Sequence, residues 1–371
     1  MIEATHIRDE FVLDPDIVFL NHGSFGACPR DVLARYQEWQ LELERQPVLF
    51  LARRLDELLA TARAALGDYV GADPDDLVFV QNTTTGLNIA ARALGLQAGD
   101  EVLSTSLEYG ALDRAWEHVC ARANARYVRM PVTLPVRSDG DVVEEVWRGA
   151  TDRTRALFLS HITSETALRL PVEELCARAR ARGLRTIVDG AHVPGHIPLD
   201  LRALDVDYYS GNCHKWVCAP KGSAFLYVRR ELQDEVHPPV ISWGYADDPP
   251  TFVSRLQKQG TRDPAAYLTV PSAIEWQREH DWDTVAARCR SLAAAAPDRL
   301  GLEPTGRAGL QMVAMHLPES PPADLKQRLY DEFAIEIPVF DRGTGLIRAS
   351  FQGYNDESDL DALADALGQL L

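Results

Sequence analysis

The pattern of hydrophobic and polar positions divides the chain into helical stretches first and extended stretches later. Apolar residues at helical spacing predict helices over residues 30–46 and 48–66. We expect the apolar face of the second helix to pack in the core or against a second subunit. From residue 77 onward, β-rich runs predict strands over residues 77–81, 101–105, 126–131, 155–161, 185–189, 205–209 and 223–228.

Helical stretches separate most of these strands, over residues 86–94, 109–123 and 171–182. Strands that alternate with helices indicate an α/β fold with a mostly parallel, seven-stranded sheet covered on both faces. The segment between the last two strands has little helical pattern, so one antiparallel strand is expected there.

The pattern changes near residue 246. A loop rich in Pro, Asp and Gly over residues 243–250 precedes a helix near 268–279 and strands near 309–316 and 346–351. We therefore predict a large domain over residues 21–245 and a smaller α+β domain over residues 246–371. Residues 1–20 are predicted to be an N-terminal segment that joins the small domain.

The charge balance of the 371-residue chain is strongly acidic, with a net charge of -17. Such a surface repels nucleic acid and anionic membranes, although local backbone donors could still bind a small anion. The N-terminus carries early acidic residues and no apolar signal-peptide core, and no apolar run approaches the roughly 20 residues of a spanning helix. We therefore expect a soluble, cytoplasmic protein.

The six cysteines are too sparse for a disulfide scaffold, and none forms a CxxC pair. Cys213, His214 and Cys218 lie close together in the sequence. No second ligand pair follows them at a spacing typical of zinc sites, so we expect no metal site.

Three unusual loops follow strands, where ligands of open α/β sheets bind. The loop QNTTTG over residues 81–86 could cradle a phosphate with its hydroxyl and N–H groups, or simply cap a helix. Asp189, at the end of an apolar strand, could hold a pyridinium N–H or cap a turn. Lys215 follows another strand between apolar stretches; it could be a buried imine former or a lysine that reaches back to solvent.

Together, and in this order, a phosphate cradle, a strand-end acid and a strand-end lysine are the groups that pyridoxal phosphate (PLP) needs. The chain resembles the class V aminotransferase family of fold-type I PLP-dependent enzymes, in its isopenicillin N epimerase-like and cysteine lyase-like branch. The resemblance spans residues 19 to about 355. The matching motifs are NHGSFG (21–26), NTTTG (82–86), DGAH (189–192), GNCHKW (211–216) and GTRD (260–263).

The resemblance implies a role for each matching residue. Lys215 would bind PLP as a Schiff base, Asp189 would pair with the pyridine nitrogen, and His192 would lie near the phenolic oxygen. Tyr109 would stack on the ring where many relatives carry His. The remaining cofactor-binding residues would be Asn82, Thr83, Thr84, Ser164, Asn212 and His214, most of them at the phosphate.

The resemblance also implies a homodimer with shared active sites, because Thr261 would reach the phosphate in the neighbouring subunit. Arg348 would bind the substrate carboxylate in a bidentate pair, unless it is an ordinary surface residue at a strand end. The loop with His22, Gly23 and Ser24 would shape the substrate pocket. Glu165 departs from the small or apolar residue expected beside the cofactor.

Several reactions could follow when Lys215 removes the Cα proton of an amino acid held as an external aldimine. They are β-elimination at a C–S bond, epimerisation, decarboxylation-dependent oxidative deamination, and transamination. We favour the C–S lyase because it needs only Lys215 and a leaving thiolate. Epimerisation comes second because it needs another proton donor, such as Tyr109 or water. The motifs do not define the substrate side chain.

Two further alternatives are disfavoured by the sequence. Desulfuration through a persulfide relay needs a mobile loop cysteine, and residues 340–345 contain no Cys. A regulatory PLP-binding domain without catalysis normally carries a DNA-binding extension, and neither end of this chain has a basic helical extension. The sequence therefore favours an enzyme.

Overall fold

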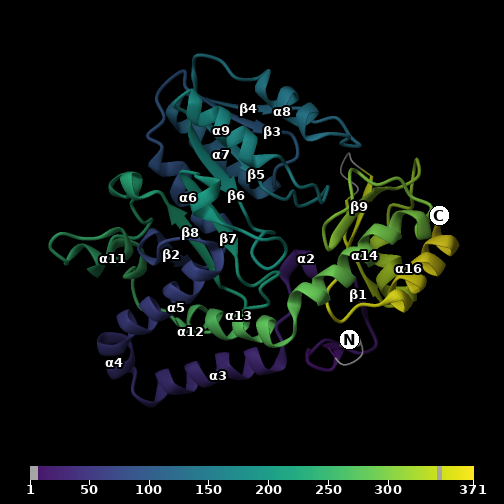
Figure 1. Cartoon of the computed structure of the whole chain (residues 1–371), viewed down its shortest axis with the longest axis horizontal. Coiled ribbons are helices and arrows are strands. Elements are labelled where there is room, and N and C mark those ends of the chain that lie inside the picture. The colour runs from purple at the N-terminus through teal and green to yellow at the C-terminus, as the bar shows by residue number, and fades with distance from the viewer. Residues whose placement is uncertain (1–6, 341–344) are drawn as a thin grey trace.

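A seven-stranded sheet forms the centre of the larger part of the molecule (Figure 1). The computed structural model describes residues 7–340 and 345–371. The strands lie in the order β2 (Leu77–Val80), β8 (Ala224–Val228), β7 (Tyr208–Asn212), β6 (Arg185–Asp189), β5 (Thr154–Ser160), β3 (Glu101–Thr105) and β4 (Arg126–Met130). β8 pairs antiparallel with β2 and β7, and the other pairs are parallel. The predicted mostly parallel α/β sheet and its antiparallel strand are confirmed.

Helices cover both faces of this sheet, so its alternate side chains enter two separate hydrophobic clusters. Leu157 packs in the cluster with α5 (Leu55–Val70) and α9 (Val172–Ala181). Phe158, the next residue of β5, packs in the cluster with α6 (Thr83–Ala93) and α7 (Gly110–Ala123). Burial on both faces explains why the strands are continuous apolar runs.

The remaining elements of the larger part lie around the sheet and the helices that cover its two faces. Residues 48–66, predicted as one helix, instead form the end of a short helix, a π-helical segment and most of α5. The elements are α2 (His22–Phe25), α3 (Arg30–Arg45), α4 (Pro47–Leu49), the π-helix Phe50–Arg54, α8 (Asp139–Trp147), α10 (Leu201–Leu204), α11 (Phe252–Gln257) and α12 (Ala265–Leu268), with 3-10 turns at Pro74–Asp76, Arg230–Glu235 and Trp243–Tyr245.

The C-terminal part holds a second, three-stranded sheet beside the last helices (Figure 1), in the order β11 (Val339–Phe340), β12 (Leu346–Ser350) and β9 (Met312–His316). A strand from the N-terminal segment, β1 (Val18–Phe19), pairs with β10 (Ile335–Glu336). α13 (Val270–Glu279) packs against α3 and α5 of the larger part and leads into the helices of the C-terminal part, which are α14 (Trp282–Leu300), α15 (Leu325–Phe333) and α16 (Glu357–Leu370). Within the residues that the structure describes, no helix is both long and apolar enough to cross a membrane.

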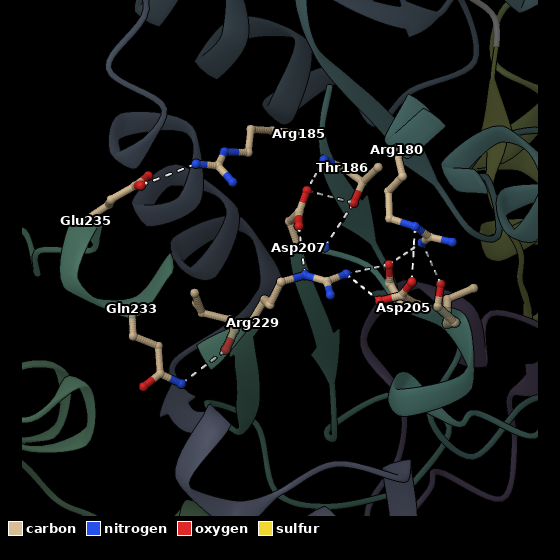
Figure 2. Close-up of polar contacts among 10 residues, drawn as sticks. Arg180, Arg185, Thr186, Asp205, Asp207, Arg229, Gln233 and Glu235 are labelled. Atoms are coloured by element: carbon tan, nitrogen blue, oxygen red, sulfur yellow. Dashed lines mark hydrogen bonds and ion pairs between the residues drawn. The ribbon is translucent and has the colours of Figure 1, made fainter. Parts of the chain in front are cut away.

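The sequence pattern predicted that this strand begins at residue 205, but β7 begins at Tyr208. A polar cluster around the preceding residues explains the difference (Figure 2). Asp205 has a left-handed backbone, with φ 53°. Asp207 accepts hydrogen bonds from the Thr186 N–H at 2.8 Å and from Arg229 Nε at 2.9 Å, and Arg229 Nη2 donates to Asp205 Oδ1 at 2.6 Å. These contacts join β6, β7 and β8 at one end of the strands. The predicted site lies at the opposite end.

Candidate active site

A cavity of about 790 Å³ lies at the carboxyl ends of β2, β5, β6 and β7. Its volume is within the range of roughly 300 to 1,000 Å³ that is usual for small-molecule sites. Most of the predicted site residues line it: Ser24, Asn82, Thr83, Thr84, Tyr109, Ser164, Asp189, His192, Asn212, His214, Lys215 and Arg348. The fold therefore brings together loops that are far apart in the sequence.

The proposed phosphate cradle is the start of α6. Asn82 caps this helix, because its Oδ1 accepts a hydrogen bond from the Thr85 N–H at 2.8 Å. The Thr83 N–H donates to Asn212 Oδ1 at 2.9 Å. Thr83 Oγ1 is buried and has no hydrogen-bond partner within the described ranges. An unpaired buried hydroxyl beside a helix N-terminus suits an anionic ligand oxygen.

Asp189 ends β6 and is almost completely buried, and its side chain lines the cavity. Its Oδ1 accepts a hydrogen bond from the Ala191 N–H at 2.8 Å. Burial raises the pKa of this carboxyl to about 6, against the opposing effects of the Ala191 N–H and of Lys215. Gly190 is required next to it, because a Cβ there would lie 2.1 Å from the Tyr209 ring.

Lys215 is partly buried and lines the cavity, and its Nζ lies 3.0 Å from His192 Nε2. Burial and then the positive charge of Arg348 lower the pKa of this amine to about 7, while Asp189 acts in the opposite direction. A substantial fraction of Lys215 is therefore the free amine at neutral pH, the form that attacks carbonyl groups and accepts protons. Its side chain lines the cavity, which favours the imine-forming interpretation of Lys215 over a lysine that reaches back to solvent.

Arg348 lies in β12, but its guanidinium is buried and lines the cavity. Nη1 donates to the Ser164 carbonyl oxygen, and Nη2 donates to Ser24 Oγ at 3.1 Å. Gly23 allows this close approach, because a Cβ there would lie 2.9 Å from Ser350 Oγ and 3.4 Å from Arg348 Nη2. A buried guanidinium that faces a cavity is suited to a carboxylate and is not an ordinary surface arginine.

Three predicted residues lie elsewhere. His22 is fully buried behind the lysine loop, with Nδ1 2.9 Å from the Tyr354 hydroxyl and Nε2 3.0 Å from the Lys215 carbonyl oxygen. Gly23 packs against Arg348 and does not line the cavity. Thr261 is exposed, in the loop whose next residues line the cavity. His22 therefore contacts the backbone of Lys215 and not the cavity.

Two sequence observations concern the surroundings of the site. Glu165 is exposed, although the loss of some surrounding water raises the pKa of its carboxyl and the nearby Arg348 opposes this rise. Most of the cysteine-free loop, residues 341–344, lies outside the described residues.

Glu108, which was not among the predicted site residues, is a buried acid that bonds to Ser160, a residue of the cavity wall. Its Oε2 accepts hydrogen bonds from the Ser160 N–H at 2.7 Å and from Ser160 Oγ at 2.6 Å, and its Oε1 accepts from Thr105 Oγ1 at 2.6 Å. Burial raises its pKa to about 7, against the effect of its hydrogen bonds. Glu108 thus ties the ends of β3 and β5 together directly before Tyr109. In the sequence Glu108 is only an acid between a strand and an aromatic residue, a pattern that does not predict its burial.

Comparison with known proteins agrees with this geometry. The model of the family described as "Aminotransferase class-V" matches residues 19–363. The chain belongs to the class-V aminotransferase family. Enzymes of this family use pyridoxal phosphate, and this protein is accordingly a PLP-dependent enzyme.

Relatives within the class-V family differ in the reactions for which they are named. The chain is 40% identical to an isopenicillin N epimerase of Amycolatopsis lactamdurans, over 98% of this chain and 97% of the relative. It is 30% identical to "Probable L-cysteine desulfhydrase, chloroplastic" of Arabidopsis thaliana, over 100% of this chain and 86% of the relative. The crystal structure of the cysteine desulfurase CsdA of Escherichia coli superposes with a TM-score of 0.84 at 25% identity, covering 100% of this chain and 98% of that one.

The residues of this class-V enzyme fit pyridoxal phosphate. The unpaired Thr83 hydroxyl and the start of α6 suit the phosphate, and the buried Asp189 suits the ring nitrogen. Lys215 has the free amine that a covalent attachment needs, and it lines the same cavity as both.

Proposed function

We propose that the protein is a C–S lyase that cleaves a cysteine conjugate by β-elimination at Cα and Cβ. In this reaction the Cα–H bond breaks, a double bond forms between Cα and Cβ, and the C–S electron pair leaves with sulfur. Water then hydrolyses the released enamine to pyruvate and ammonia. The observation that carries the proposal is the Lys215 amine, which lines the cavity with a lowered pKa and supplies the proton transfer at Cα that this reaction requires.

Each residue has a defined part in this proposal. When bound, pyridoxal phosphate supplies the electron sink that makes the Cα proton acidic. Arg348 binds the substrate carboxylate and so fixes the orientation of the Cα–H bond. Lys215 Nζ accepts the Cα proton. Asp189 would hold the ring nitrogen, and Tyr109 would stack on the ring.

The second candidate is epimerisation of an amino acid at Cα. The 40% identity with an isopenicillin N epimerase favours it. Epimerisation requires a proton donor on the face of Cα opposite Lys215. The hydroxyl of Tyr109 is available for this task, because its side chain lines the cavity from the loop before α7.

Product analysis distinguishes the two reactions. We expect purified enzyme to release pyruvate, ammonia and a sulfur product in equal amounts, the sulfur product being sulfide from L-cysteine and a thiol from cysteine S-conjugates. The Tyr109→Phe enzyme should keep this activity within about tenfold, because stacking survives and the hydroxyl is not used. Loss of chirality and uptake of deuterium at Cα without pyruvate, abolished in Tyr109→Phe, would instead establish the epimerase.

We also propose that the enzyme is a cytoplasmic homodimer in which Thr261 reaches the phosphate of the partner's cofactor. Thr261 is exposed, and its neighbours Arg262 and Asp263 line the cavity of their own subunit. Exposed large apolar residues such as Phe25, at 72%, support a contact with a second copy. All six cysteines, which lie within the described ranges, are unpaired, as suits a reducing compartment.

Sedimentation equilibrium tests the dimer, and cofactor retention tests the shared site. We expect twice the chain mass, and about tenfold weaker retention of pyridoxal phosphate in Thr261→Ala, since one charge-assisted hydrogen bond is lost. The matched control Thr61→Ala changes an exposed threonine of α5. A monomer, or retention equal to that of the control, would contradict this part of the proposal.

A further inference from the structure

His192 and His196 lie in the loop after β6, and one ring nitrogen of each contacts an N–H group that can only donate a hydrogen bond. These contacts fix which ring nitrogen carries the proton. His196 Nε2 lies 2.7 Å from the backbone N–H of Gln311, which is a donor. The proton of the neutral His196 ring must therefore be on Nδ1, which donates to the His192 carbonyl oxygen at 3.0 Å. Gln311 directly precedes β9, so a residue of the C-terminal part holds this loop.

The second histidine, His192, faces the catalytic lysine. Its Nδ1 accepts a hydrogen bond from Trp216 Nε1 at 3.3 Å, and an indole N–H is only a donor. Burial, followed by the charge of Lys215, lowers the pKa of His192 well below 6.5, so that the ring is neutral. Its proton is then on Nε2, the atom that lies 3.0 Å from Lys215 Nζ.

We propose that Trp216 is a positioning residue that holds His192 in the Nε2–H tautomer, so that His192 is a fixed hydrogen-bond donor toward the catalytic lysine. A neutral imidazole with both nitrogens engaged in this way cannot accept a proton from Lys215 or from the substrate. His192 is therefore not a general base of the reaction, and proton transfer at Cα is left to the amine.

The packing around Trp216 restricts the indole to this orientation. The side chain is fully buried, and its ring stacks on His196 with centroids 4.0 Å apart and an angle of 29° between the planes. Gln277 Nε2 donates to the Trp216 carbonyl oxygen at 2.7 Å. Gly195, with φ 83°, lets the loop approach, because a Cβ there would lie 2.4 Å from the Trp216 carbonyl group. The indole N–H is thus aimed at His192 from a rigid support.

The inference rests on contacts of this chain and does not depend on which reaction the enzyme catalyses. Both an elimination and an epimerisation use the same lysine. A failure of the tautomer assignment would therefore leave the proposed lyase untouched, and failure of the lyase assay would leave the tautomer assignment untouched.

Nitrogen NMR of the purified full-length enzyme, with its cofactor and ¹⁵N-labelled histidine, tests the inference. The His192→Gln enzyme identifies the His192 signals among those of the ten histidines. We expect a protonated Nε2 and an unprotonated, hydrogen-bonded Nδ1 in the wild type. In Trp216→Phe, which removes the indole N–H but keeps an aromatic ring, the ratio of Nδ1–H to Nε2–H tautomer should rise roughly fivefold, because a hydrogen bond is lost.

The control is Trp116→Phe, which removes a buried indole from α7 outside the cavity and should leave the His192 signals unchanged. Protonation of Nδ1 in the wild type, or His192 signals in Trp216→Phe that equal those of the wild type, would overturn the assignment to Trp216. The wild-type spectrum decides the tautomer by itself if Trp216→Phe does not fold.

Discussion

The Lys215→Ala enzyme is expected to lose about 10³- to 10⁴-fold in kcat, because removal of a positioned proton-transfer group costs up to about that factor. It is also expected to lose the visible absorption of lysine-bound cofactor. Both effects follow from the same amine, whose Nζ lies 3.0 Å from His192 Nε2 in the cavity that Asp189 and Arg348 also line. Steady-state kinetics and an absorption spectrum of the purified variant measure them.

The lowered pKa of Lys215 gives this expectation a pH dependence. An amine with a pKa of about 7 is mostly protonated below pH 7 and mostly free above it. The rate at which cofactor-free protein captures pyridoxal phosphate should therefore fall about tenfold per pH unit below 7 and level off above it. With an ordinary lysine pKa, the fall would extend to much higher pH.

A matched control for this variant is Lys326→Ala, because Lys326 is exposed on α15 and does not line the cavity. Its activity and spectrum should equal those of the wild type. If Lys215→Ala retained the visible band while Lys326→Ala or another lysine variant lost it, the cofactor would be attached elsewhere.

The second large effect is expected at Arg348. The Arg348→Ala enzyme should lose about 10³-fold in kcat/KM, because a buried bidentate pair with a carboxylate contributes on the order of 4 kcal/mol. Most of this loss should appear in KM, since the carboxylate is bound before and during the proton transfer. Arg348→Lys should recover only part of it, because an ammonium group cannot make the two parallel hydrogen bonds.

A substrate without a carboxylate separates binding from structural damage. The wild type should prefer a cysteine conjugate strongly over the corresponding amine, and Arg348→Ala should lose this preference. Arg328→Ala, which removes a partly exposed arginine that pairs with Glu332 on α15, is the control and should behave as the wild type. If Arg348→Ala still preferred the cysteine conjugate over the amine, the substrate carboxylate would bind to another residue.

Much of the cofactor site could be predicted from the sequence, because its residues follow strands directly. Asp189 and Lys215 come after apolar runs, and parallel strands bring their carboxyl ends to one edge of a sheet. Thr83 opens a helix after a strand, which is also a local pattern. Such positions depend on the order of elements and little on the packing of side chains.

The remainder of the site depends on contacts between distant segments. The indole of Trp216 reaches His192, and Gln311 reaches His196 over 115 residues, so no local pattern reports either contact. His22 lies in a motif that predicted substrate binding, yet its ring contacts the Lys215 backbone. Glu108 is buried by the packing of β3 against β5, which an acidic residue in a loop does not predict.

The attachment of the cofactor to Lys215 is the central claim, and reductive trapping tests it most directly. Treatment of the purified enzyme with borohydride, followed by proteolysis and mass spectrometry of the peptides, identifies the modified lysine. We predict one pyridoxyl-modified site, on the peptide that carries Lys215. Modification of Lys221, Lys258 or Lys326 in its place, or an unmodified Lys215 in enzyme that holds stoichiometric cofactor, would contradict the account.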